Sequence, residues 1–220
     1  MKLKDFRKSA WNSLSGNWGM AVLVFFILVI LQGLVTFKII LISADPTIML
    51  IFNIIGIITG IISIIVTGPF MLSAAHISIS FADEDYVEVS DVFYGFKYFS
   101  KSISLLLLNA LFTALWTLLL IVPGIIKGIS YSMSYFVMRD NPELSANEAR
   151  IRSAEMMDGY KLDYFLLSLS FIGWILLSVL TLGILLLWVI PYINVTTAKF
   201  YQYINPDGRK YDEYYDGEDE

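Results

Sequence analysis

Four long stretches of this chain contain almost no charged residue, and this feature limits its fold more than any other. They are residues 18–37, 46–82, 102–138 and 164–198, and the one charge within them is Lys127. A helix that crosses a bilayer needs about 20 apolar residues, and a charge at its centre costs about 2.5–3.5 kcal/mol on insertion scales. The pattern therefore predicts an all-α integral membrane protein that is polytopic, which means that it crosses the bilayer several times.

The three longer stretches exceed the length of one straight span. A helix over all of residues 46–82 would be about 55 Å long, whereas the hydrocarbon core is about 30 Å thick. Gly68-Pro69, Pro123-Gly124 and Thr181–Gly183 lie near the centres of these stretches and predict kinks or turns. We therefore expect a bundle of about six transmembrane helices, with kinked or half-spanning segments, at residues 18–42, 47–82, 102–122, 124–138, 164–181 and 184–204. The fourth helix is short, which leaves open whether residues 124–138 span fully.

Lysine and arginine collect at two places outside the apolar stretches, and short loops rich in these residues stay cytoplasmic. The two places are the N-terminal segment and the 139–163 loop, with Lys2, Lys4, Arg7, Lys8, Arg139, Arg150, Arg152 and Lys161. The 38–46 loop has only Lys38 and is expected outside. The chain then divides into a cytoplasmic amphipathic segment (1–17), a transmembrane domain (18–204) and an acidic, disordered cytoplasmic tail (205–220), with both termini in the cytoplasm.

The net charge of −5 comes from the end of the chain. Residues 205–220 hold seven acidic and two basic residues, so the preceding part is electrically balanced and does not suit nucleic-acid binding. There is no cysteine and only one histidine, which excludes disulfides, thiolate metal sites and clusters of several histidines. We therefore expect no catalytic residue, no cofactor or metal, and no nucleic-acid partner.

Two segments between the apolar stretches have the pattern of short cytoplasmic helices. In residues 83–101, apolar residues recur every three or four positions, which predicts an amphipathic helix capped by Ser90. This helix would lie in the membrane interface or pack on the protein's own transmembrane helices. In residues 139–163, Ser145 and Glu148 have the spacing of a capping box, and Gly159 is expected to end the helix.

Four polar residues within the apolar stretches are candidates for a transport path. They are His76, Asn53, Asn109 and Lys127. His76 can carry protons, but hydrogen bonding to a neighbouring helix is the more common use of such a residue. The asparagines equally fit hydrogen bonds between helices, and Lys127 fits an anchor at the outer rim of the membrane. Gly56-x-x-x-Gly60 and Gly124-x-x-x-Gly128 permit close helix contact within or between subunits.

Three parts of the chain resemble a known family. They begin at RKSAWNSLSGNWGMAV, TGPFMLSAAHISISFADEDY and IVPGIIKGISYSMSYFVMRDNPELSANEAR, and the third continues through SFIGW and LTLGI. Together they resemble the bacterial integral membrane family called domain of unknown function 975, and more distantly the membrane domain beside some glycerophosphodiester phosphodiesterases. The resemblance implies a multi-pass protein of the bacterial plasma membrane. It implies no activity and no site residues.

Three functions fit these observations, and the first is favoured. It is a non-enzymatic scaffold or bilayer-interacting protein whose partners are the lipid bilayer and a membrane or cytoplasmic protein. The alternative is a small-solute or ion transporter or channel lined by His76, Asn53, Asn109 and Lys127. The third, least favoured, is a lipid-headgroup enzyme that uses a divalent metal held by Asp83, Glu84, Asp85 or Asp140. Homo-oligomer formation is left open by the sequence.

Overall fold

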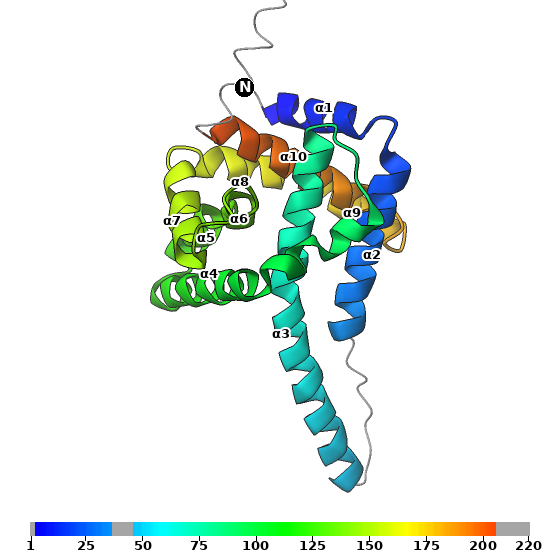
Figure 1. The fold of residues 1–220 in the computed structure, drawn as a ribbon, viewed down its shortest axis with the longest axis vertical. Helices are drawn as coiled ribbons and strands as arrows, with labels where there is room; N and C mark the ends of the chain where they lie inside the picture. The colour runs from blue at the N-terminus through cyan, green and yellow to red at the C-terminus, as the bar shows by residue number, and fades with distance from the viewer. Residues whose placement is uncertain (1–2, 37–45, 206–220) are drawn as a thin grey trace, which may run out of the picture.

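The computed structural model describes residues 3–36 and 46–205, and all regular elements there are helices (Figure 1). The expectations for Lys2, Lys38, residues 37–42 and the tail from residue 206 concern positions outside these ranges. The α-helices are α1 (Leu3–Leu14), α2 (Trp18–Thr36), α3 (Pro46–Ala82), α4 (Phe99–Leu119), α5 (Ile121–Ser130), α6 (Ser134–Asp140), α7 (Ala146–Met156), α8 (Lys161–Leu169), α9 (Ile172–Leu180) and α10 (Leu186–Ile204). A 3-10 helix, η1 (Val89–Tyr98), precedes α4.

The longest helix, α3, continues through Gly68-Pro69, which agrees with the single helix expected over residues 47–82. The pair marks the place where α3 crosses η1 and the start of α4. A Cβ atom on Gly68 would lie 2.7 Å from the Ser102 carbonyl oxygen, and one on Gly95 would lie 1.9 Å from the Pro69 carbonyl oxygen. Both glycines are therefore needed for close backbone approach.

The segment expected to form an amphipathic helix, residues 83–101, packs on the protein's own long helix. Val92 and Gly95 of η1 are buried, and the Gly95 N–H donates to Ser73 Oγ of α3 at 2.9 Å. The cap is Glu88, whose N–H donates to the Asp91 carboxylate at 2.8 Å. The expectation of Ser90 as the cap is wrong because Asp91, a stronger acceptor three residues after Glu88, completes a capping box there.

The first hairpin, α4 and α5, turns at Leu120 and not at Pro123-Gly124. Leu120 has extended backbone angles (φ −156°, ψ 137°), and Pro123 lies in the first turn of α5, where its missing N–H is not needed. Gly124 instead brings α5 against α4, since a Cβ atom there would lie 2.1 Å from Thr117 Oγ1. The helix expected over residues 124–138 is divided at residues 131–133 into α5 and α6.

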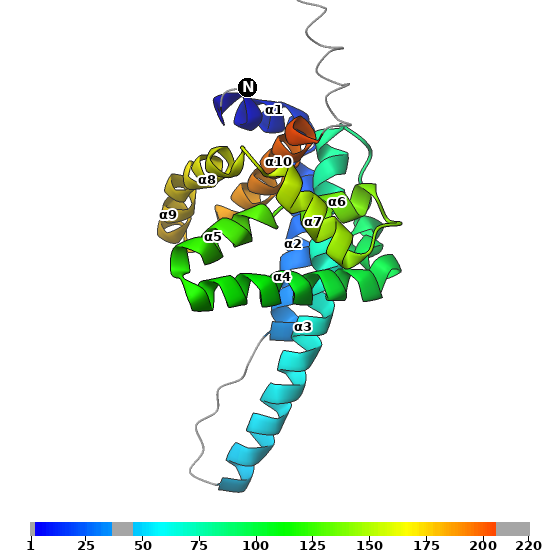
Figure 2. The same ribbon diagram turned by 90° about the vertical axis from the view of Figure 1, so that its left-hand side faces the viewer.

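The second hairpin turns where the sequence predicts it. Leu182 and Gly183 both have positive φ (52° and 87°), a conformation that glycine adopts without strain. The segment before this turn is two helices, α8 and α9, separated at Ser170 and Phe171. Figure 2 shows the turn between α4 and α5 on the same side of the molecule as α9.

Four helical segments are long and apolar enough to cross a membrane, or five if the bent pair α1 and α2 counts as one span. The four are Met49–Ala82, Val89–Leu119, Ile121–Asp140 and Lys161–Leu180. The expected count of about six is therefore not reached within the described residues. Helix α10, expected as the sixth span, contributes Val195, Phe200 and Tyr201 to the core.

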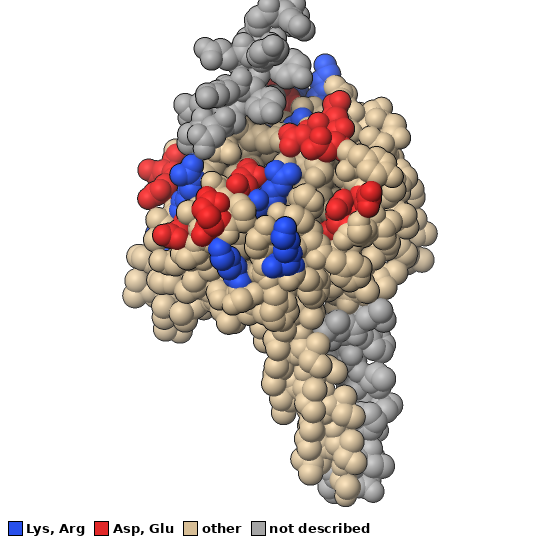
Figure 3. All heavy atoms as spheres, in the orientation of Figure 1, with Lys and Arg blue, Asp and Glu red and all other residues tan. Residues whose placement is uncertain are grey.

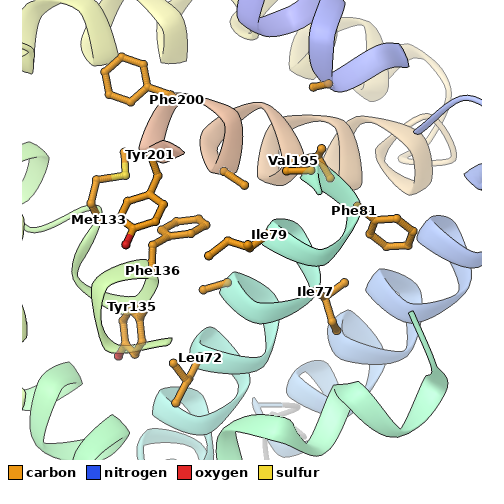
Figure 4. Packing of buried hydrophobic residues seen from close by; sticks show 14 of the residues in the cluster. Leu72, Ile77, Ile79, Phe81, Met133, Tyr135, Phe136, Val195, Phe200 and Tyr201 are labelled. Carbon is orange, nitrogen blue, oxygen red and sulfur yellow. The ribbon is translucent and has the colours of Figure 1, made fainter. Parts of the chain in front are cut away.

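The hydrophobic core surrounds one half of α3. Side chains of α3 such as Leu72 and Ile79 lie on the side of residues 133–136 and α10, whereas Ile77 and Phe81 lie toward α2 (Figure 4). The Phe136 and Tyr201 rings stack with centroids 5.3 Å apart. We call residues 68–82 the packed half of α3 and residues 46–67 the protruding half, which extends beyond the other helices (Figure 1).

Candidate functional site

Five ionisable side chains beside the packed half of α3 form one connected group, which we call the polar network: His76, Asp91, Arg139, Asp140 and Tyr201. Arg139 lies at its centre. Its Nη1 is 2.8 Å from Asp140 Oδ1, and its Nε donates to His76 Nδ1 at 3.3 Å. The Tyr201 hydroxyl donates to Asp140 Oδ2 at 2.7 Å, and His76 Nε2 is 3.9 Å from Asp91 Oδ1. The network therefore links α3, η1, α6 and α10.

The neighbouring end of α3 is held by two residues of α10. Lys199 Nζ donates to the carbonyl oxygen of Ala82, which is the last residue of α3, and such a cation is favourable at a helix C-terminus. Gln202 Nε2 donates to Asp83 Oδ1 at 2.6 Å. Burial raises the pKa of the Asp83 carboxyl, while the bond from Gln202 acts in the opposite direction.

The side chains of the polar network bond to one another and thereby connect helices. His76 accepts from Arg139 and stacks on Tyr94, with ring centroids 3.8 Å apart. Asp140 accepts from both Arg139 and Tyr201. Within residues 3–36 and 46–205, no three His, Asp or Glu side chains gather so that they could hold a metal ion. These mutual bonds fix the relative positions of α3, α6 and α10.

A second polar group, the arginine junction, lies between the first hairpin and α7 and comprises Asn109, Phe112, Tyr131, Ser134 and Arg150. The Arg150 guanidinium carbon lies 3.9 Å from the Phe112 ring centroid and 5.0 Å from that of Tyr131. Its Nη2 donates to Asn147 Oδ1 at 2.6 Å, whereas its buried Nε has no hydrogen-bond partner. Asn109 Nδ2 donates to Ser134 Oγ at 2.8 Å, and its buried Oδ1 has no donor.

The four predicted path residues lie in different surroundings, and no hydrogen bond or ion pair of the described residues joins two of them. His76 belongs to the polar network and Asn109 to the arginine junction. Lys127 on α5 places its Nζ 5.1 Å from the Trp116 ring centroid on α4. Asn53 is exposed on the protruding half, 23 residues before His76 on the same helix, which corresponds to about 34 Å.

Sequence reasoning did not single out the arginine junction or the bond between Tyr201 and Asp140. Arg150 was read only as one of several cytoplasmic charges. The sequence nevertheless contains a signal for its burial, because three small residues, Ala146, Ala149 and Ser153, lie within about one turn of it. The structure buries all three. Small residues around a single arginine on a helix indicate that this side packs closely against other helices.

Charged and apolar side chains occupy different parts of the surface. Lys, Arg, Asp and Glu gather over the body of the molecule, while the described part of the protruding half has none (Figure 3). Exposed apolar side chains cover the protruding half and the outer ends of both hairpins. Examples are Ile57, Leu118, Leu119, Val179, Leu180 and Leu182.

Comparison with known protein families gives a match over nearly the whole chain. A family model described as "Protein of unknown function (DUF975)" matches residues 1–127 and residues 117–207. No curated protein and no solved structure matches the chain, so the expected similarity to the membrane domain of glycerophosphodiester phosphodiesterases finds no support.

Proposed function

Because the chain belongs to the family of unknown function DUF975, we propose its role from its own structure: a non-enzymatic membrane scaffold that holds a charged surface at the cytoplasmic side of the bacterial plasma membrane. The observation that carries this proposal is the separation of exposed apolar side chains from charged ones. An apolar surface of this extent is covered by lipid or by other protein. The proposal puts both termini on the cytoplasmic side, where the lysines and arginines of the N-terminal segment and of the 139–163 loop favour them.

The apolar part has the dimensions that a bilayer requires. The protruding half is about 33 Å long, close to the roughly 30 Å of a hydrocarbon core. Its isoleucines are exposed along its whole length, including Ile51, Ile57 and Ile64. The ends of the two hairpins add exposed leucines on one side of the body, and because α4 runs across α3 (Figures 1 and 2), the first hairpin would lie in the membrane interface beside a spanning α3.

The charged part offers a surface that another protein can contact. The loop after α3 has three consecutive acidic residues, Asp83 to Asp85, followed by Tyr86, whose exposed fraction is 82%. Glu84 has a positive φ of 60°, so the loop turns sharply away from the helix. An exposed aromatic ring among acidic side chains suits a partner segment with lysine or arginine.

The transporter alternative has weaker support. Its four candidate residues have separate partners, and a path from Asn53 to His76 would follow α3 for about 34 Å. The stretch between them contains Thr59 and Thr67, whose hydroxyls donate to the carbonyl oxygens of Ile55 and Ser63 on the same helix. Hydroxyls that are bonded in this way present little polarity to a solute.

Single cysteines provide the test, because the natural chain has none. In inside-out membrane vesicles, we expect a membrane-impermeant maleimide to label Tyr86→Cys and to leave Ile58→Cys unlabelled. A photocrosslinking amino acid at position 86 should then capture one defined protein, and the same group at Leu180 should capture lipid. Equal labelling of both cysteines would contradict the proposed placement. Solute or ion flux through liposomes that contain only the purified protein would contradict the scaffold role.

A further inference from the structure

His76 is the only histidine of the chain, and its two ring nitrogens face different elements. Nδ1 accepts a hydrogen bond from Arg139 Nε of α6 at 3.3 Å. Nε2 lies 3.9 Å from Asp91 Oδ1 of η1. Because an arginine side chain has donors and no acceptor, Nδ1 carries a lone pair in this contact. The ring proton of neutral His76 is therefore on Nε2, the nitrogen that faces Asp91.

A second proton on His76 would have opposite effects on its two sides. A protonated Nδ1 can no longer accept from Arg139, and two positive charges would then face each other between α3 and α6. On the other side, an imidazolium attracts the Asp91 carboxylate and the face of Tyr94, whose ring is stacked on His76 with centroids 3.8 Å apart. The contact with α6 thus favours neutral His76, and both contacts with η1 favour the protonated form.

The other charged groups near His76 leave this contrast in place. Asp85, in the loop after α3, attracts a protonated ring and so acts in the same direction as Asp91. Helix α2 has no titratable side chain. On the remaining elements that pack against α3, charged side chains are engaged elsewhere: Arg7 of α1 with the Phe171 ring, Lys101 of α4 with the carbonyl oxygens of residues 142–144, and Lys199 of α10 with that of Ala82.

We propose that His76 is a pH-operated link, which holds α6 against α3 while it is neutral and, on protonation, releases Arg139 and pairs with Asp91 of η1. Arg139 keeps its ion pair with Asp140 in both states, so the release leaves no unpaired charge on α6. Acidification therefore weakens the hold of α3 on the end of α6 and strengthens its hold on η1. This inference goes beyond the scaffold role and does not depend on the placement in the membrane.

The first test is nitrogen NMR of the full-length protein in detergent micelles, labelled with 15N-histidine, because the single histidine gives only two ring signals. At about pH 8 we expect a ring that is protonated at Nε2 and bare at Nδ1. Arg139→Gln removes the positive neighbour and should raise the titration midpoint by about 0.5 or more on the pH scale, whereas Asp91→Asn should lower it. Arg139→Lys keeps the charge and should stay closer to the wild type, which guards against a folding defect in Arg139→Gln.

The second test is hydrogen exchange, which measures the release itself. Protection factors, which remove the intrinsic pH dependence of exchange, should fall about threefold or more for the α6 amides between about pH 8 and pH 5.5, the scale of one lost hydrogen bond. Those of α2, which has no titratable side chain, should stay constant. His76→Asn keeps an acceptor near the place of Nδ1 and cannot be protonated, so the protection of α6 should not change with pH in this variant.

Three results would overturn the link. A proton on Nδ1 at the higher pH, or equal titration midpoints in the wild type and Arg139→Gln, would show that Arg139 does not bond to this nitrogen. Midpoints that shift as expected, with α6 protection that stays constant, would show that protonation releases nothing. An equal loss of α6 protection in His76→Asn would assign the pH dependence to another group.

Discussion

The two halves of α3 belong to one continuous apolar helix and have opposite surroundings. The protruding half consists mainly of isoleucine with Gly56 and Gly60, and nothing lies within 4 Å of a Cβ atom built on either glycine. The packed half alternates large residues with alanine and serine, and Gly68 is in backbone contact with Ser102. The two halves are therefore similarly apolar, yet one extends beyond the other helices and the other lies in the hydrophobic core.

The difference teaches that apolarity alone does not decide which part of α3 packs against other helices. Helices in a bilayer gain nothing from apolarity alone when they associate, and small residues let their backbones approach. The two Gly-x-x-x-Gly pairs show the same contrast. Gly124 is used inside the chain against Thr117, whereas Gly56 and Gly60 have no neighbour among the described residues.

The largest expected effect comes from filling the crossing of η1 and α3. Gly95→Ala places a Cβ atom 1.9 Å from the Pro69 carbonyl oxygen, so one backbone must move. We expect this overpacking to lower the free energy of unfolding by at least about 2 kcal/mol. The matched control, Gly56→Ala, adds a methyl group in open space and should stabilise the helix by about 0.5–1 kcal/mol. Reversible unfolding in mixed micelles measures both variants, and equal effects would remove the distinction between the two halves.

A smaller effect is expected at the polar network. Tyr201→Phe removes the hydroxyl that donates to Asp140 and leaves the stacking with Phe136 in place. A hydrogen bond to a charged group is worth about 1.5–3 kcal/mol, and partial exposure of Asp140 favours the lower end of this range. Tyr86→Phe, at an exposed position, should not change the unfolding curve. An unchanged curve for Tyr201→Phe would mean that the network does not contribute to the stability around the packed half.

The capping box of α7 should contribute less. Ser145 Oγ accepts from the Glu148 N–H at 3.3 Å, and the Glu148 carboxylate accepts from the Ser145 N–H at 2.7 Å. Ser145→Ala should cost about 1 kcal/mol, and hydrogen exchange of the first amides of α7 should rise. These bonds hold the pKa of Glu148 below its usual value, so their contribution is present above that value. It should disappear as the pH falls through the lowered pKa, and exchange that is unaffected by such acidification would contradict this assignment.

The smallest effect is expected in the protruding half. Asn53→Leu replaces an exposed amide, for which no hydrogen bond is described, by an apolar side chain. The free energy of unfolding should change by less than about 0.5 kcal/mol, since no contact with the body is lost. A large loss of stability or of cellular function would indicate that Asn53 faces a partner or a path, and would favour the transporter alternative.

Helix positions followed from the sequence more reliably than helix ends and contacts did. The start of α2 and α3, the turn at Thr181–Gly183 and the cap at Ser145 match expectation, because each depends on residues close together in the chain. Gly68-Pro69 lies within one helix as expected, and the turn expected near Pro123-Gly124 lies three residues earlier, at Leu120, but neither expectation included the close contacts that these glycines make. A glycine beside a proline in an apolar helix equally suits a crossing, and only the partner helix decides which applies. The partners of Arg139 and Arg150 lie in other helices, so local patterns could not reveal them.

The sequence by itself determined that the chain is helical, that several helices have membrane-spanning length, and that one family includes it. These properties depend on composition and on spacing within a few turns. The tertiary structure alone decided that α10 joins the core, that α4 runs across α3 (Figures 1 and 2), and that Arg150 is buried between two aromatic rings. Those outcomes depend on contacts between side chains that are far apart in the chain. The hydrophobic effect is non-directional, so an apolar sequence pattern does not specify which helices pack together.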